Sequence, residues 1–150
     1  MIELKHILVP IDFSVTSELA LRYAKEFGVA FGATLHLVHV NDDPTLFAHT
    51  TSDKYRAESE AKSNDDLAEI LNKGSVRDVK TTLVTRFGSA ATTLLDYAKD
   101  EDIDLIIMGS HGRTALANIL LGSVAEHIFR HGPCPVMTVK TPEHEFIKED

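Results

Sequence analysis

The chain has 150 residues, of which 43% are hydrophobic and 25% are charged, and this size and composition are typical of one globular domain. Its net charge of −8 argues against a non-specific nucleic-acid binder, and its apolar runs are too short for insertion into a membrane. A single cysteine, Cys134, and the lack of a secretory pattern at the N-terminus favour a cytoplasmic location. We expect one domain over residues 1–150, with a core over about 4–140 and a loose tail over 141–150.

The first half of the chain alternates strand patterns with helix patterns. Residues 6–11 predict a short apolar strand that ends near Pro10, because proline cannot donate to the ladder of a central strand. Aromatic and leucine side chains recur every fourth residue from Leu19 to Phe31, which predicts an amphipathic helix from about Ser14 to Gly32. The elements expected next are a strand over 34–40, a polar loop over 41–52 and a helix over about 53–73 with Gly74 after its end.

The second half continues the same alternation. Strict alternation within one domain predicts an α/β fold, a single open, doubly wound, five-stranded parallel sheet with helices on both faces, which is a Rossmann-like architecture. The elements expected here are a strand over 79–87, a helix that starts after Gly88-Ser89 and runs through Ala98, a strand over 104–108, a helix over 123–131 and a strand over 135–140.

Two of the expected strands are candidates for the centre of the sheet. The strands over 6–11 and 104–108 are the most uniformly apolar, as expected of strands that are buried on both sides. If they are neighbours, the strand order reverses between them, and open α/β sheets bind ligands at such a switch point, beyond the carboxyl ends of the strands. Asp12 follows the first of these strands and Gly109 follows the second. Both positions therefore indicate one crevice.

Three glycines after the fourth strand have a spacing typical of a phosphate site. Gly109 and Gly112 come directly after the strand, and nine residues separate Gly112 from Gly122, which precedes a Ser-x-x-Glu pattern at 123–126. That pattern is a capping box and predicts a helix whose N-cap is Ser123. Glycines let backbone N–H groups approach an anion, and a helix N-terminus adds donors and partial positive charge. We expect a phosphate cradle.

Other nucleotide and phosphate motifs do not fit this sequence. Neither the Gly-x-x-x-x-Gly-Lys-Ser/Thr loop nor the Gly-x-Gly-x-x-Gly fingerprint occurs. A phospho-receiver would cluster acidic residues after its first and third strands, whereas here Asp12 stands alone and Arg86-Phe87-Gly88 occupies the other position. The segment from Pro10 to Ser14 also lacks the Ser-Gly-Gly-x-Asp-Ser loop of adenylating synthetases.

The remaining motifs resemble those of the universal stress protein family. They are Val9-Pro-Ile-Asp-Phe-Ser14, the Gly109-x2-Gly112-x9-Gly122-Ser123 spacing, and residues 122–130 followed by Pro133-Cys-Pro-Val136. The resemblance covers about residues 4–140. Members of this family that bind ATP carry the glycine motif, and members that do not bind ATP lack it. The resemblance therefore implies an ATP-binding member, and it allows Mg²⁺ beside the triphosphate, although no carboxylate cluster marks a metal site.

The resemblance also implies roles for individual residues at the adenosine end of the site. Pro10, Ile11 and Asp12 would line this end, with Asp12 near the base or the ribose. Val40, at the end of the second strand, would contact the adenine.

At the other end, Met108 and Gly109 would border the ribose and the first phosphate. His111 lies within the glycine loop, where it either contacts a phosphate or faces solvent. Ala115 stands where many members have another glycine, which would stiffen the loop. The residues implied to hold the phosphates are Gly112, Arg113, Gly122, Ser123 and Val124.

Several of these residues, and a few others, also have a different interpretation. Asp12 can cap the helix that starts near Ser14. His127 and His131 lie four residues apart on one helix face and could share a metal with Cys134, but His131 also complements the dipole of its helix. Cys134 lies between two prolines and is interpreted as a packing residue.

Three functions remain open for this sequence. The first is a nucleotide-responsive regulatory module of a stress response, with a protein partner yet to be identified. The second is a slow ATP hydrolase or phosphotransferase in the same crevice, although the lack of a conspicuous general base within the glycine motif favours binding. The third is a structural interaction protein with an empty crevice. The strand over 136–140 would lie at a sheet edge with an apolar surface, and the resemblance implies a homodimer through it.

Overall fold

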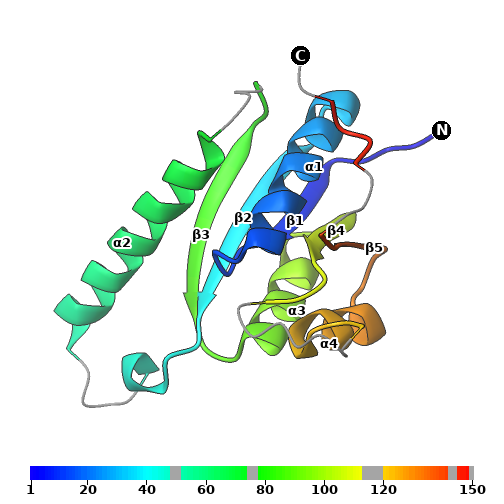
Figure 1. Cartoon of the computed structure of the whole chain (residues 1–150). Coiled ribbons are helices and arrows are strands. Elements are labelled where there is room, and N and C mark those ends of the chain that lie inside the picture. The colour runs from blue at the N-terminus through cyan, green and yellow to red at the C-terminus, as the bar shows by residue number, and fades with distance from the viewer. Residues whose placement is uncertain (48–51, 74–77, 113–119, 142–144, 149–150) are drawn as a thin grey trace.

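Five parallel strands form one sheet in the order β3-β2-β1-β4-β5, and helices connect them (Figure 1). The computed structural model describes residues 1–47, 52–73, 78–112, 120–141 and 145–148. The strands are β1 (His6–Pro10), β2 (Thr34–Asn41), β3 (Thr81–Phe87), β4 (Leu105–Gly109) and β5 (Val136–Val139). The helices are α1 (Val15–Phe31), α2 (Asp53–Leu71), α3 (Ala90–Asp100) and α4 (Ser123–His131), and a short 3₁₀ helix covers Pro44–Phe47.

The order of the strands confirms the predicted doubly wound sheet. β1 and β4 are neighbours, with Ile7 opposite Leu105 and Leu8 opposite Ile106. β2 and β3 follow on one side of β1, and β5 follows on the far side of β4, so the order reverses between β1 and β4. The predicted switch point therefore lies where these two central strands end.

Helices cover both faces of the sheet, as predicted (Figure 1). In β1, Ile7 and Val9 belong to a core shared with α1 and α2, whereas Leu8 belongs to a core shared with α3 and α4. This alternation follows from the period of two along a strand. From Ile7 to Pro10, β1 is thus buried on both sides, which is the reason for the uniformly apolar composition of this part of the strand.

Most boundaries differ from the prediction by one or two residues. β3 starts at Thr81 rather than at residue 79, and β5 covers Val136–Val139 rather than 135–140. The polar loop over 41–52 contains the 3₁₀ helix. The exact end of a strand depends on its hydrogen bonds to neighbouring strands, and the sequence pattern of one strand does not show where these bonds stop.

α1 begins and ends where the sequence predicts. Ser14 is its N-cap, with an extended backbone (φ −75°, ψ 160°) and a side chain that accepts the N–H of Ser17 at 3.3 Å. At the other end Gly32 has φ +66°, a left-handed conformation that glycine adopts without strain, and its N–H donates to the carbonyl of Gly28. The first cap fixes the point at which the chain enters α1 after β1.

A buried ammonium group ties α2 to α1. Lys25 of α1 is only 6% exposed, and its Nζ donates to the carbonyl oxygens of Leu71 and Lys73 at the C-terminal end of α2. Burial lowers the pKa of Lys25, while the partial negative charge of the helix end favours a cation there. Gly74, which was predicted to follow this helix, lies outside the described residues.

The C-terminal residues 145–148 contact α1. The ring of Phe146 stands edge-on to the ring of Tyr23, with 4.8 Å between centroids, and Glu145 pairs with Arg22 at 3.2 Å. Within the tail that was expected to be loose, Glu145 and Phe146 thus contact α1. An aromatic side chain within a polar segment was the available signal for this contact.

Three hydrogen-bonding side chains form a chain between β1, β2 and α3. Nδ1 of His6 lies 3.0 Å from Nε2 of His36, and Nδ1 of His36 lies 2.7 Å from the hydroxyl oxygen of Tyr97. Burial lowers the pKa of His36, and the neighbouring His6 lowers it further, whereas Glu101 acts in the opposite direction. His36 is therefore neutral in the folded protein at neutral pH.

The lowered pKa of His36 predicts a loss of stability in mild acid. In the unfolded chain this histidine binds a proton near its ordinary pKa of 6.5, whereas the folded protein takes it up only at lower pH. The unfolded state then holds more protons, so the free energy of unfolding falls below about pH 6.5, by at most about 1.4 kcal/mol per pH unit for one proton. Urea denaturation between about pH 7.5 and 5 should give a shallower pH dependence for His36→Gln than for the wild type. Equal pH dependences would contradict this assignment.

Candidate functional site

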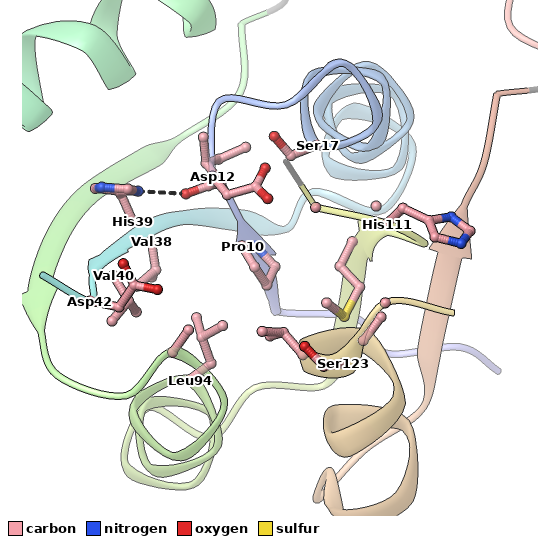
Figure 2. A pocket seen from close by; sticks show the side chains of 18 of the residues that line it. Pro10, Asp12, Ser17, Val38, His39, Val40, Asp42, Leu94, His111 and Ser123 are labelled. Carbon is pink, nitrogen blue, oxygen red and sulfur yellow. Dashed lines mark hydrogen bonds between the residues drawn. The ribbon is translucent and has the colours of Figure 1, made fainter. Parts of the chain in front are cut away.

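A cavity of about 560 Å³ opens at the carboxyl ends of the central strands (Figure 2). It lies at the switch point between β1 and β4, and its volume is within the range of small-molecule sites. Arg113, one of the predicted site residues, lies outside the described part of the chain. The predicted residues that line the cavity are Pro10, Ile11, Asp12, Val40, Met108, Gly109, His111, Gly112, Gly122, Ser123 and Val124.

One side of the cavity is apolar. Pro10 ends β1, Val38 and Val40 come from β2, Leu94 from α3 and Met108 from β4. Figure 2 shows Val40 and Leu94 on the side of the cavity that is remote from the glycine loop. These side chains provide a wall on which a flat apolar group can be buried.

Asp12 lies in the turn between β1 and α1 and faces the glycine loop. Its Oδ1 accepts the N–H of Ser14 at 3.0 Å and also the hydroxyl of Ser14. A Cβ atom on Gly112 would lie 2.6 Å from Oδ2 of Asp12, so no side chain fits beside this carboxylate unless it moves. Asp12 is therefore not the helix cap that the sequence allowed. Ser14 is the N-cap of α1, and Asp12 holds Ser14 in place.

The start of the glycine loop is packed against the first turn of α1. A Cβ atom on Gly109 would lie 2.6 Å from Oγ1 of Thr16 and 3.0 Å from the backbone nitrogen of Ser17. The hydroxyl of Thr16 donates to the carbonyl of His111. Glycine at position 109 is thus required by the close approach of a helix, whether or not a ligand is bound.

The N-terminus of α4 opens onto the cavity. Gly122 is its N-cap, with φ −65° and ψ 161°, and the carbonyl of Gly122 accepts the N–H of Glu126 at 2.9 Å. Ser123 is therefore the first helical residue, and the predicted capping box is wrong, because no side-chain cap forms at this helix end and the Glu126 carboxylate pairs with Arg130 at 3.1 Å. The first N–H groups of a helix without a side-chain cap are available to an anion.

The turn that carries Asp12 has an unusual backbone conformation. Phe13 has φ +63°, which costs a residue with a side chain about 1 kcal/mol. His39 of β2 contacts both sides of this turn. Its Nδ1 lies 2.8 Å from the carbonyl oxygen of Ile11, and its ring centroid lies 4.8 Å from that of Phe13. Because a carbonyl oxygen can only accept, Nδ1 of His39 carries the proton.

The cavity also includes residues that the sequence analysis did not single out. Ala90 and Leu94 belong to the start of α3, and a helix that follows a parallel strand begins at the carboxyl edge of the sheet, which was an available signal. Asn41 and Asp42 directly follow Val40 and were open to the same reasoning. The other lining residues are Ser17, Val38, His39 and Ala125.

Neither a metal-binding cluster nor a membrane-spanning helix occurs within the described ranges. Among these residues, no group of three or more His, Cys, Asp or Glu side chains could hold a metal ion. The rings of His127 and His131 lie 4.8 Å apart, while Cys134 packs against the core under α3 and α4. Burial raises the pKa of the Cys134 thiol, and Asp104 raises it further. None of the helices described is long and apolar enough to cross a membrane.

Comparison with known proteins identifies related sequences over almost the whole chain. The profile of the universal stress protein family matches residues 3–140. The universal stress protein MJ0577 of Methanocaldococcus jannaschii is 32% identical over 157 residues, which cover 91% of this chain and 94% of that protein. The putative universal stress protein SSP1056 of Staphylococcus saprophyticus is 34% identical and covers 95% of this chain and 87% of its own length.

Solved structures agree with this relationship. The structure of MJ0577 superposes with a TM-score of 0.81 and covers 95% of this chain and 100% of its own. Two structures of lower identity share the fold: a universal stress protein in complex with cAMP (20% identical, TM-score 0.68) and the universal stress protein from Archaeoglobus fulgidus in complex with dAMP (21%, TM-score 0.66). They cover 94% and 93% of this chain, and all of their own chains. On the strength of the profile match and of relatives that are more than 30% identical along nearly their full length, this chain belongs to the universal stress protein family.

Proposed function

We propose that the cavity binds an adenine nucleotide, ATP in particular, and that occupancy by this nucleotide regulates the protein in a cytoplasmic stress response. One observation carries the proposal. An apolar wall, a glycine loop and a helix N-terminus without a side-chain cap all border the same cavity at the switch point of the sheet. A nucleotide needs these three features, because it has a flat base at one end and anionic phosphates at the other.

The base and the ribose are assigned to the side formed by β1, β2 and α3. Pro10 and Ile11 from β1 and Val40 from β2 would enclose the adenine together with Leu94. Asp12 would accept a hydrogen bond from a ribose hydroxyl, since its carboxylate lines the same cavity. Met108 and Gly109, at the end of β4, would border the ribose and the first phosphate.

The phosphates are assigned to the start of α4. The N–H groups of Ser123 and Val124 belong to its first turn, where the helix dipole adds partial positive charge. Gly112 and Gly122 expose backbone at the cavity, and His111 and Arg113 remain predicted phosphate contacts. Mg²⁺ bound to a triphosphate keeps several waters and takes few protein ligands, so it would need no carboxylate cluster in this cavity.

The related structures support the adenine part of this proposal. The two universal stress proteins solved with cAMP and with dAMP share the fold of this chain, and both ligands contain adenine and a phosphate. The finer step, from an adenine nucleotide to ATP, is supported by the extent of the anion-facing part of the cavity, which both the glycine loop and the start of α4 line.

A second candidate function is slow ATP hydrolysis, and one observation favours it. The Asp12 carboxylate lies beside Gly112 in the glycine loop, which is closer to the phosphate end than the resemblance implied. Oδ1 of this carboxylate already accepts two hydrogen bonds from Ser14, so this oxygen is engaged in holding the turn rather than directed at a substrate. We therefore place binding before catalysis.

The proposed phosphate site predicts a strong effect of Ser123→Pro. Proline suits the first position of a helix, and the extended backbone of Gly122 (φ −65°, ψ 161°) is the conformation that a residue before proline adopts. The substitution removes one N–H and one hydroxyl from the site while α4 is retained. We expect ATP affinity, measured by calorimetry, to fall by about tenfold or more, as for lost hydrogen bonds to a charged group.

Ser123→Ala is the matched control for this variant, because it removes the hydroxyl and keeps the N–H. Its affinity should lie between those of the wild type and Ser123→Pro, with similar thermal stability in all three. The nucleotide that denatured wild-type protein releases, once identified, shows which ligand the site holds. An ATP affinity of Ser123→Pro equal to that of the wild type would overturn the assignment of the phosphates.

Turnover separates the two candidate functions. If the site binds without catalysis, phosphate release from ATP by the purified protein stays at the background rate with Mg²⁺ present. Release well above background that is lost in both Asp12→Asn and Gly122→Val would establish hydrolysis instead. Asp12→Asn tests the base, and Gly122→Val tests whether the activity belongs to this cavity.

We also propose a homodimer through β5, which lies at the edge of the sheet. The N–H of Ile106 donates to the carbonyl of Pro135 at 3.0 Å, and the N–H of Ser110 donates to that of Val139 at 2.8 Å. The odd-numbered residues of β5 therefore face β4, and Val136 and Thr138 direct their backbone groups to the open edge. An edge of this kind is a template for a strand of a second copy.

Thr138→Pro tests this dimer without touching the β4–β5 ladder. It removes an outward N–H, and proline is tolerated on an edge strand in that position. Sedimentation at micromolar concentration should give a dimer for the wild type and for Thr138→Ala, and a folded monomer for Thr138→Pro. A wild-type monomer, or a dimer that survives the proline, would contradict the proposed interface.

A further inference from the structure

His39 makes two contacts that converge on the turn after β1. Its side chain is 8% exposed and lines the cavity. Nδ1 donates to the carbonyl of Ile11 (the dashed line in Figure 2), and the ring packs against Phe13. Asp12 lies between these two residues, so the imidazole holds the chain on both sides of it.

The turn needs such support because its backbone is strained. Phe13 is one of two described residues other than glycine with a positive φ, at +63°. Conformations of this kind persist where the surrounding contacts over-determine them. If the bond to Ile11 were lost, Phe13 could relax toward negative φ and the Asp12 side chain would turn away from Gly112, which its Oδ2 now faces.

We propose that His39 is a positioning residue of the nucleotide site. It acts through the Ile11–Phe13 turn by fixing the Asp12 carboxylate beside the glycine loop. A preorganised turn raises affinity, because the entropy cost of ordering it arises on folding and not on binding. The proposal rests on the proposed function, since it assigns His39 a role in binding the same ligand.

His36 provides an internal control on the same strand. It is also a buried histidine of β2, at 6% exposed, and it also makes a hydrogen bond, to Tyr97 of α3. His36 and His39 are separated by an odd number of positions, so they face opposite sides of the sheet. His36 does not line the cavity. Loss of a buried histidine bond can therefore be compared at the site and away from it.

The test uses two substitutions of nearly equal size. Asparagine can present an amide N–H close to the position of imidazole Nδ1, whereas leucine has the same shape and no donor. We expect His39→Leu to bind ATP about tenfold more weakly than the wild type, and His39→Asn to remain within about threefold. His36→Leu should lower the unfolding temperature and leave ATP affinity unchanged.

A nucleotide-free readout keeps this inference separate from the proposed function. The amide N–H of Ser14 donates to Oδ1 of Asp12 at 3.0 Å, so its proton chemical shift reports the position of that carboxylate. The chemical shift of this amide proton should change in His39→Leu and should stay the same in His39→Asn and His36→Leu. A wild type that binds no adenine nucleotide would refute the proposed function alone. A wild type that does bind ATP, but no more tightly than a folded His39→Leu, would overturn the role of His39, and so would an unchanged Ser14 chemical shift in that variant.

Discussion

The parallel pairing of β1 with β4 is the constraint on which the site depends. It puts the carboxyl ends of the two strands side by side, although the 94 residues 11–104 separate the end of β1 at Pro10 from the start of β4 at Leu105. Long-range strand pairing rather than local sequence therefore builds the cavity.

 The turn after β1 and the loop after β4 therefore meet, and α1, which follows β1, packs against β4. This contact leaves no room for a side chain at Gly109, whose Cβ would lie 2.6 Å from Oγ1 of Thr16. The first glycine of the motif is consequently a requirement of helix packing before it is a requirement of any ligand.

The charges around the cavity favour one arrangement of an anionic ligand. The protein carries a net charge of −8, and Asp12 and Asp42 both line the cavity. Basic side chains among the described residues are therefore not the main source of attraction for an anionic ligand. Backbone N–H groups and the dipole of α4 supply positive potential locally. A phosphate is thus favoured at the start of α4 and disfavoured beside Asp12, unless a cation or a ribose hydroxyl lies between them.

The order of the elements and most of the cavity lining could be predicted from the sequence, because both follow from patterns along the chain. Alternating elements and two apolar strands were sufficient to place Asp12 and Gly109 at one crevice. Details that depend on contacts between distant segments could not be predicted in this way. The capping box at Ser123 was wrong because helix initiation at Gly122 depends on the backbone around it, including its bond to Ser110. The contact of His39 with the Ile11–Phe13 turn depends on the register of β2 against β1, which the sequence does not contain locally.

Ser110 joins the start of α4 to the edge of the sheet. Its N–H donates to the carbonyl of Val139 in β5 at 2.8 Å, and its own carbonyl accepts the N–H of Gly122 at 2.6 Å. The residue is 4% exposed, so both bonds are shielded from water and costly to leave unmade. Gly122 cannot shift relative to Val139 without stretching one of them. The N-cap that borders the cavity and the last residue of the edge strand are therefore connected through Ser110, although they belong to the two separate interaction sites that we propose.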